Sequence, residues 1–383
     1  MKDGLHIIDS DLHVIEPSDV YEQYLDERYR SVMPKYLGWA PTNFPHWEVQ
    51  GHIIPPWALD RDVANAQKYM DTPTEDVYRS IRQRDYDAIS TLESMGVEGI
   101  DFAVLYRTFA HMVVSIDSLE AEYATACCAA FNDWLADYCA TDPKRLKASA
   151  ILSLHDPEMA AAEARRAVEE KHDVAVVLLP MPVNGRYFNA PECDVLWREL
   201  TRLRVPLTFH GTSGGACQDY VSNRFVGLPN FRTLNHASAF PFELMLALGA
   251  MTLGGVLERF PDLRVGFLEG NCGWLPWWLE RLDDQWGKYG GGESVKLSAL
   301  PSEYFKRQCF IATDVDEEML KIVIDMIGDE NVVMSVDYPH SDGPFPHGID
   351  TFLELPGVGL ESKKKIMWNN CLRLYGFSDD LAT

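Results

Sequence analysis

The sequence predicts an α/β protein, a (β/α)8 TIM barrel with a long irregular lid insertion after the first strand and helix. Eight apolar runs typical of buried strands alternate with helical patterns along the chain. Side chains that commonly bind metal stand where four of these runs end. No internal repeat, low-complexity run or linker divides the 383 residues, so we expect residues 1–383 to form a single domain.

The first predicted strand lies within Leu5 to Pro17 and ends in a cluster of carboxylates and an imidazole. Alternate side chains of a strand share one face, so Asp9, Asp11 and His13 are expected to point the same way. A helix is predicted next, over 18–29. The barrel therefore begins with a strand that carries three groups able to bind metal.

The segment at about 32–74 is rich in Pro, Trp and Gly and shows no clear period. A loop of this length is rare in a compact domain unless it has a function, so we interpret it as a lid over the strand ends. Its Trp39, Trp47 and Trp57 are candidates to line an apolar pocket, and Trp57 is the candidate substrate contact. Simple packing of the insertion is the alternative role for each of them.

The remaining elements alternate between strand and helix. Strands are predicted at 99–106, 147–152, 173–180, 205–210, 263–269, 308–314 and 332–337. Helices are predicted at 77–96, 117–140, 156–170, 192–203, 241–259, 274–286, 316–328 and 361–374. Parallel strands need crossover connections, and eight such units close into a barrel whose active site lies at the C-terminal ends of the strands.

The composition excludes several classes of partner. Lys and Arg total 34 against 58 acidic residues, a formal charge of −24, and nucleic-acid binding needs clustered positive charge. No apolar run approaches the roughly 20 residues of a membrane helix, and the first residues do not read as a signal peptide. The eight cysteines include no CxxC pair. We therefore expect a cytoplasmic protein with reduced thiols and no nucleic-acid or membrane partner.

Six residues at strand ends are candidate metal ligands: Asp11, His13, His210, Glu269, Asp337 and His340. A set of two imidazoles and two carboxylates would leave positions for water or substrate and suit one zinc or manganese ion. All six are enough for two ions, and their oxygen-rich character favours iron or manganese. A hydrogen-bonding role is the alternative for His340, so one ion and two ions both stay open.

These motifs resemble the amidohydrolase superfamily, specifically the amidohydrolase-2 branch with its aminocarboxymuconate-semialdehyde decarboxylase-like and resorcylate decarboxylase-like enzymes. The resemblance covers nearly the whole chain and rests on IDSDLH, NDWLADYCATDPKRLKASAIL, PLTFHGT, GGVLERFPDLRVGFLEGNCGWLPWWLERLD and SVDYPHSDG. It implies that Asp11, His13, His210 and Asp337 are metal ligands and that the protein is a homo-oligomer, a dimer. Glu269 departs from the family, which usually has an acid/base histidine there.

We therefore expect a metal-dependent hydrolase or carboxy-lyase (decarboxylase) acting on a small carboxylated or aromatic substrate. A metal-bound water or substrate oxygen would be activated at the C-terminal end of the barrel, and Glu269 or Asp337 would move the proton. A non-heme dinuclear iron or manganese monooxygenase on the same barrel is the first alternative, because Glu269 and His340 enlarge the ligand set. A barrel subunit without catalytic activity is the second.

Four further residues are candidates for the site. His236 is a catalytic, metal or substrate candidate, with a structural role at a loop-to-helix junction as the alternative. Arg107, Arg186 and Arg232 lie near predicted strand ends and could each bind a substrate carboxylate through two N–H donors, with surface roles as the alternative. The histidines without supporting context, His111 among them, are interpreted as structural.

Overall fold

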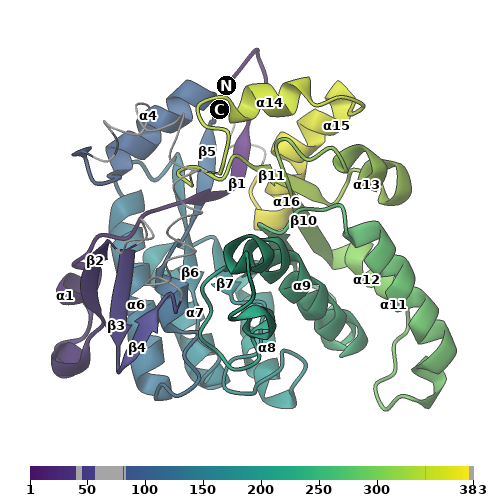
Figure 1. Cartoon of the computed structure of the whole chain (residues 1–383). Coiled ribbons are helices and arrows are strands. Elements are labelled where there is room, and N and C mark those ends of the chain that lie inside the picture. The colour runs from purple at the N-terminus through teal and green to yellow at the C-terminus, as the bar shows by residue number, and fades with distance from the viewer. Residues whose placement is uncertain (40–44, 57–80, 82, 341, 379–383) are drawn as a thin grey trace.

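A computed structural model describes residues 1–39, 45–56, 81, 83–340 and 342–378 (Figure 1). Eight parallel strands form one sheet in the order β1-β5-β6-β7-β8-β9-β10-β11. Their bounds are β1 (Ile8–His13), β5 (Phe102–Tyr106), β6 (Leu146–Ile151), β7 (Ala175–Leu178), β8 (Leu207–His210), β9 (Val265–Leu268), β10 (Cys309–Asp314) and β11 (Val332–Ser335). The eight predicted strands and the barrel are thus confirmed.

Hydrogen bonds of side chains and backbone join β1 to β11 and to the residues just after it, so the first and last strands of the sheet are connected. The Ser10 hydroxyl donates to the Met334 carbonyl at 2.8 Å, and the Val336 N–H donates to Oδ2 of Asp9 at 2.9 Å. The His13 backbone N–H donates to the carbonyl of Tyr338, also at 2.8 Å. We call this junction the seam, and through it the sheet closes on itself as a barrel.

Helices surround the sheet (Figure 1). They are α4 (Ala88–Glu98), α5 (Ala110–Val113), α6 (Ala121–Cys139), α7 (Pro157–Lys171), α8 (Asp194–Leu203), α9 (Phe231–Leu253), α10 (Val256–Arg259), α11 (Leu275–Tyr289), α12 (Pro301–Gln308), α13 (Leu320–Ile327), α14 (Gly348–Glu354), α15 (Leu360–Lys364) and α16 (Asn370–Tyr375). Helix α7 shows why such segments fold: Asp156 accepts hydrogen bonds from the first-turn amides, and a left-handed His172 ends the helix.

Helix α9 differs from the prediction of a helix over 241–259. It begins at Phe231, so His236 lies inside a helix rather than at a loop-to-helix junction, and Pro241 is accommodated within the helix. By length and composition α9 could cross a membrane, but half of its 18-residue apolar window is buried in the protein, as in a core helix. Proline is disfavoured in a helix interior and tolerated in its first turn, so a start at 241 is the simpler expectation for this segment.

The segment predicted as an irregular lid contains regular structure where it is described. Strands β2 (Lys35–Trp39), β3 (Pro45–Val49) and β4 (His52–Ile54) form an antiparallel sheet, so an irregular fold was wrong there. On β3, Trp47 is buried, and the centre of its ring lies 5.5 Å from that of Phe109. Of the two roles considered for Trp47, these contacts favour packing of the insertion. Trp57 and the rest of 57–74 lie outside the described residues, as does the side chain of Trp39.

The other predicted boundaries need small corrections. The helix predicted over 18–29 is a short α1 (Val20–Tyr24) followed by a 3-10 helix (Glu27–Val32). Helix α4, predicted over 77–96, starts at Ala88, and the side chain of Asp87 caps it by accepting a hydrogen bond from the Ser90 N–H. Residues 77–80 of the predicted helix lie outside the described residues. Helices α5, α12 and α14 were not predicted. All eight cysteines are buried and free.

Candidate metal centre

Strands β1 and β8 bring Asp11, His13 and His210 together at the barrel mouth. Nε2 of His210, the last residue of β8, lies 3.2 Å from Oδ1 of Asp11 and 3.1 Å from Nε2 of His13. All three side chains are at most 2% exposed. Asp9 does not join them, because its carboxylate accepts from the backbone N–H groups of Asp11 and Val336.

Glu269 completes a four-residue group. It follows β9 in a left-handed conformation with φ of 49°, and its Oε2 lies 2.8 Å from Nε2 of His210 and 3.4 Å from Nε2 of His13. The ligand atoms of Asp11, His13, His210 and Glu269 all lie within 4.8 Å of one another. Oδ1 of Asp11 is buried without a hydrogen-bond partner among the described residues, which is costly unless a cation satisfies it. These four residues can therefore hold a divalent metal.

Backbone carbonyls orient both imidazoles. Nδ1 of His13 lies 2.9 Å from the carbonyl oxygen of Arg107, and Nδ1 of His210 lies 2.9 Å from that of Gly211. Because a carbonyl oxygen only accepts, each Nδ1 carries a hydrogen, so the lone pair of Nε2 faces the centre whenever the ring is neutral. This arrangement is the one that metal-binding histidines adopt.

Asp337 and His340 form a second group that overlaps the first. Oδ1 of Asp337 lies 3.5 Å from Nε2 of His13 and 2.8 Å from Nδ1 of His340. The other ring nitrogen of His340 lies 3.1 Å from the hydroxyl of Thr108. Since His13 and Glu269 belong to both groups, the structure brings all six candidate ligands together and offers places for one ion or two.

The histidines of the centre differ in pKa. Burial, followed by the charge of His340, lowers the pKa of His13 to about 4, whereas carboxylates raise the pKa values of His210 and His340. Burial and Arg107 lower the pKa of His210, but Asp11 and Glu269 outweigh them and raise it to about 9. Burial likewise lowers the pKa of His340, and Asp337 outweighs it to give about 10. In the metal-free protein, His210 and His340 therefore hold protons, and their positive charges balance those of the nearby carboxylates.

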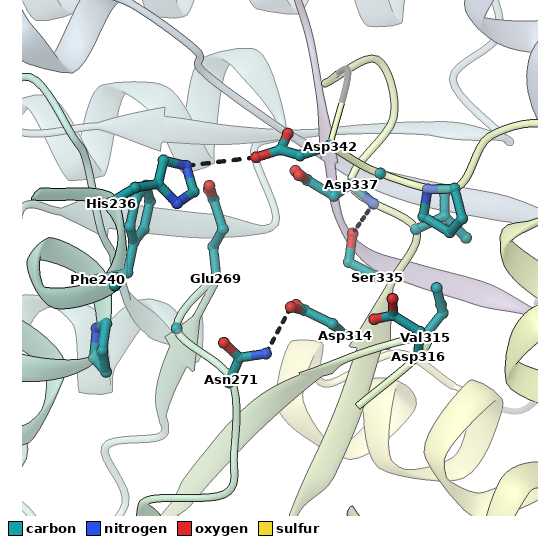
Figure 2. A pocket seen from close by; sticks show the side chains of 16 residues that line it. His236, Phe240, Glu269, Asn271, Asp314, Val315, Asp316, Ser335, Asp337 and Asp342 are labelled. Atoms are coloured by element: carbon teal, nitrogen blue, oxygen red, sulfur yellow. Dashed lines mark hydrogen bonds and ion pairs between the residues drawn. The ribbon is translucent and has the colours of Figure 1, made fainter. Parts of the chain in front are cut away.

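A cavity of about 200 Å³ opens beside Glu269 and Asp337 (Figure 2). His236 points into it from α9, and its Nε2 lies 3.4 Å from Oδ2 of Asp342. Asp314, at the end of β10, accepts a hydrogen bond of 2.6 Å from the side-chain amide of Asn271. The metal centre thus opens into a polar space that could hold a small molecule.

The three candidate arginines lie in different places. Arg107 is buried at the centre, where its Nη2 donates to the carbonyl of His210 at 2.8 Å. Arg232, on α9, donates to the hydroxyl of Ser213 at 3.2 Å and is 9% exposed. Arg186 is not brought to the centre, because it donates to two carbonyls of the loop after β6.

Sequence reasoning missed two residues of this region, Asp314 and Asp342, which line the cavity. Asp314 ends an apolar strand in the same way as Glu269 does, so the same rule could have selected it. Asp342 lies in the loop that follows His340, where no strand pattern marks it.

Glu16 supports the loop that carries Arg107, and its loss is expected to destabilise the protein. It is 5% exposed, and its Oε1 accepts from the backbone N–H groups of Thr108, Phe109 and Ala110 at 2.8–3.1 Å. Glu16→Ala leaves these donors unpaired, so we expect the free energy of unfolding to fall by about 1–3 kcal/mol in urea denaturation.

Glu22→Ala is the control for this change. Glu22 is exposed on α1, and its loss is expected to change the free energy of unfolding by less than about 0.5 kcal/mol. Equal effects of the two substitutions would show that the Glu16 carboxylate does not support the loop.

Comparisons with known proteins agree with this geometry. A family model described as Amidohydrolase matches residues 87–377. The chain is 29% identical over 262 residues to Decarboxylase orsB of Emericella nidulans, covering 62% of this chain and 72% of that protein. It is 24% identical over 308 residues to 2-amino-3-carboxymuconate-6-semialdehyde decarboxylase of Dictyostelium discoideum, covering 78% of this chain and 79% of that protein.

A solved structure supports the fold. The 5-carboxyvanillate decarboxylase of Novosphingobium aromaticivorans, in complex with manganese and 4-hydroxy-3-methoxy-5-nitrobenzoic acid, superposes with a TM-score of 0.70 at 19% identity and covers 98% of this chain and 97% of that one. The resemblance to the amidohydrolase-2 branch is confirmed. The family match spans about three quarters of the chain, and the chain therefore belongs to the amidohydrolase family.

Proposed function

We propose that this chain is a manganese-dependent decarboxylase of small carboxylated compounds, aromatic or unsaturated. The observation that carries the proposal is the buried Oδ1 of Asp11, which faces the Nε2 atoms of His13 and His210 without a hydrogen-bond donor among the described residues. The named relatives support decarboxylation. They lend no support to the oxygenase alternative.

Decarboxylation breaks the bond between the substrate's carbon and its carboxylate, releases CO2, and leaves an electron pair that takes up a proton. Asp11, His13, His210 and Glu269 would hold the metal, and Asp337 lies close enough to join them. A bound divalent metal supplies Lewis-acid charge that holds and polarises substrate oxygens. The protein must then position the substrate and deliver one proton to the carbon that has lost CO2.

Among the three candidate acids, we assign the proton to His236. Oε2 of Glu269 contacts both imidazoles of the centre, and Oδ1 of Asp337 is engaged by His340, so both carboxylates serve the metal site first. His236 instead faces the cavity where a substrate would lie, with Asp342 beside it to orient the ring. Burial, followed by the charge of Arg232, lowers the pKa of His236 despite Asp342, so a proton on this ring is given up readily and can pass to a reacting carbon.

His236→Gln tests this assignment. We expect kcat for CO2 release to fall about 100-fold, since a positioned general acid contributes at least that much, while the manganese content stays unchanged. His6→Gln is the matched control, because His6 also pairs with an aspartate, Asp101, at 3.6 Å, away from the residues that line the cavity. Loss of manganese in His236→Gln, or an unchanged kcat, would rule the assignment out.

Turnover tests the function itself. The manganese-loaded protein is offered a panel of hydroxybenzoates that includes 5-carboxyvanillate and 2,6-dihydroxybenzoate, and CO2 release and O2 uptake are followed together. We expect CO2 release without O2 uptake. O2 uptake without CO2 would favour the oxygenase, and the number of metal ions per chain, from elemental analysis, shows whether His340 serves a second ion.

A further inference from the structure

Two buried side chains beside the metal centre have polar atoms without partners. His111 is 4% exposed and Arg107 is 1% exposed. Within the described part of the chain, neither ring nitrogen of His111 has a hydrogen-bond partner, and neither do Nε and Nη1 of Arg107. Buried polar groups are nearly always hydrogen-bonded, so two neighbouring exceptions call for a ligand. Arginine donates only and a neutral imidazole donates from one nitrogen, so the ligand they suit is an acceptor.

Both side chains lie on the β5–β8 side of the centre. Arg107 follows β5, yet its Nη2 reaches the carbonyl of His210 at the end of β8, so its guanidinium crosses the barrel mouth. Burial, followed by the positive charges of Arg107 and His210, holds the pKa of His111 well below its usual range. Arg107 and His111 belong to one short segment, because the backbone N–H groups of Thr108, Phe109 and Ala110 between them all donate to the carboxylate of Glu16.

The short helix α5, which carries His111, is firmly held. Its first N–H groups donate to the carboxylate of Glu16. On the β8 side it packs so tightly against the following loop that a Cβ on Gly214 would lie 2.7 Å from Cε of Met112. The donors of this subsite are therefore held in place before a ligand arrives, which limits the entropy lost on binding.

The opposite side of the centre is acidic. The cavity on the β9–β11 side is lined by Glu269, Asp314, Asp337 and Asp342 (Figure 2). Like charges repel strongly at short range in a partly desolvated space, so a substrate carboxylate is disfavoured there. Hydroxyl or amino groups of a substrate could instead donate to these carboxylates. The two sides thus differ in the chemical groups that they accept.

We propose that Arg107 and His111 form an anion subsite that binds the carboxylate of the substrate, while the rest of the molecule extends into the acidic cavity. The inference rests on the proposed function in taking a carboxylic acid as the ligand. It narrows the substrate to a small acid that carries hydrogen-bond donors away from its carboxylate. His236 lines the cavity into which the rest of the molecule would extend.

Binding of benzoate and benzamide to the manganese-loaded protein tests the subsite, because the two probes differ in charge and hardly in shape. We expect isothermal titration to show tighter binding of benzoate. His111→Leu is expected to weaken benzoate binding about tenfold or more, with benzamide binding and manganese content unchanged. His111→Gln keeps an N–H donor and should recover part of the preference.

His155→Leu is the matched control. His155 is 5% exposed, but its Nδ1 lies 2.6 Å from the hydroxyl of Ser153 and its Nε2 lies 2.9 Å from the carbonyl of Ile116. Its removal is expected to lower stability more than the loss of His111 does, because it leaves these partners unpaired, and to keep the preference for benzoate.

The inference is overturned if the wild-type protein does not distinguish the two probes, or if His111→Leu keeps the full preference. These outcomes are separate from turnover. A protein that prefers benzoate through His111 but releases no CO2 from any acid tested would refute the proposed function and leave the anion subsite standing.

Discussion

Replacing Asp11 with asparagine is expected to remove manganese from the purified protein and to lower CO2 release at least about 1,000-fold. The substitution keeps the shape of the side chain but takes away the charge at Oδ1, which lies 3.2 Å from Nε2 of His210. A metal ion contributes several kcal/mol to catalysis, and each factor of ten in rate corresponds to about 1.36 kcal/mol. Elemental analysis and a CO2 assay on the same preparation measure both effects.

Asp9→Asn provides the control, since Asp9 is also a buried aspartate of β1. Its carboxylate accepts from backbone N–H groups at 2.9 Å, so its role is to join strands rather than to bind an ion. We expect Asp9→Asn to retain manganese. If Asp11→Asn keeps both metal and activity, the assignment of the centre is wrong.

The metal-free protein is expected to lose stability as the pH rises from about 6.5 to 9. Asp11 and Glu269 outweigh burial and raise the pKa of His210 to about 9. Below pH 6.5 both the folded and the unfolded chain hold this proton, so its stabilising effect is fully present. Between 6.5 and 9 only the folded chain keeps it, and above 9 the effect is lost.

For His210, the expected loss in the free energy of unfolding is on the order of 3 kcal/mol, because one pKa unit corresponds to about 1.36 kcal/mol. The raised pKa of His340 changes the stability in the same direction. Urea denaturation in the presence of a chelator at pH 6 and pH 9 measures it. With manganese the dependence should reverse, since the metal binds neutral imidazoles and competes with protons. A chelated protein as stable at pH 9 as at pH 6 would contradict the charge arrangement of the centre.

The sequence was sufficient for the barrel and the ligand candidates because both depend on local patterns. Eight apolar runs marked the strands, and the period of two along β1 placed Asp11 and His13 on one face. Polar side chains at the ends of such runs stood out, as with His210 and Glu269. Parallel strands then bring these ends together without further information.

The rest depended on contacts between distant segments. His111 resembled a core residue, since the neighbouring positive charge of Arg107 and the missing partners become visible only after folding. His236 was placed at a junction because the helix was predicted to start at residue 241, whereas α9 begins at Phe231. The sheet of β2, β3 and β4 was missed because its strands are short and rich in Pro, Gly and Trp, which obscures the alternation.

The seam gives metal binding a mechanical consequence. Asp11 and His13 lie on one side of the seam and Asp337 lies on the other. The two sides are joined by hydrogen bonds that include those of Ser10 and Asp9. An ion held from both sides acts as a cross-link between the first and last strands of the sheet. Transient separation of these strands should therefore become rarer when the ion binds, and the amide hydrogens of β1 and β11 should exchange with solvent more slowly in the loaded protein.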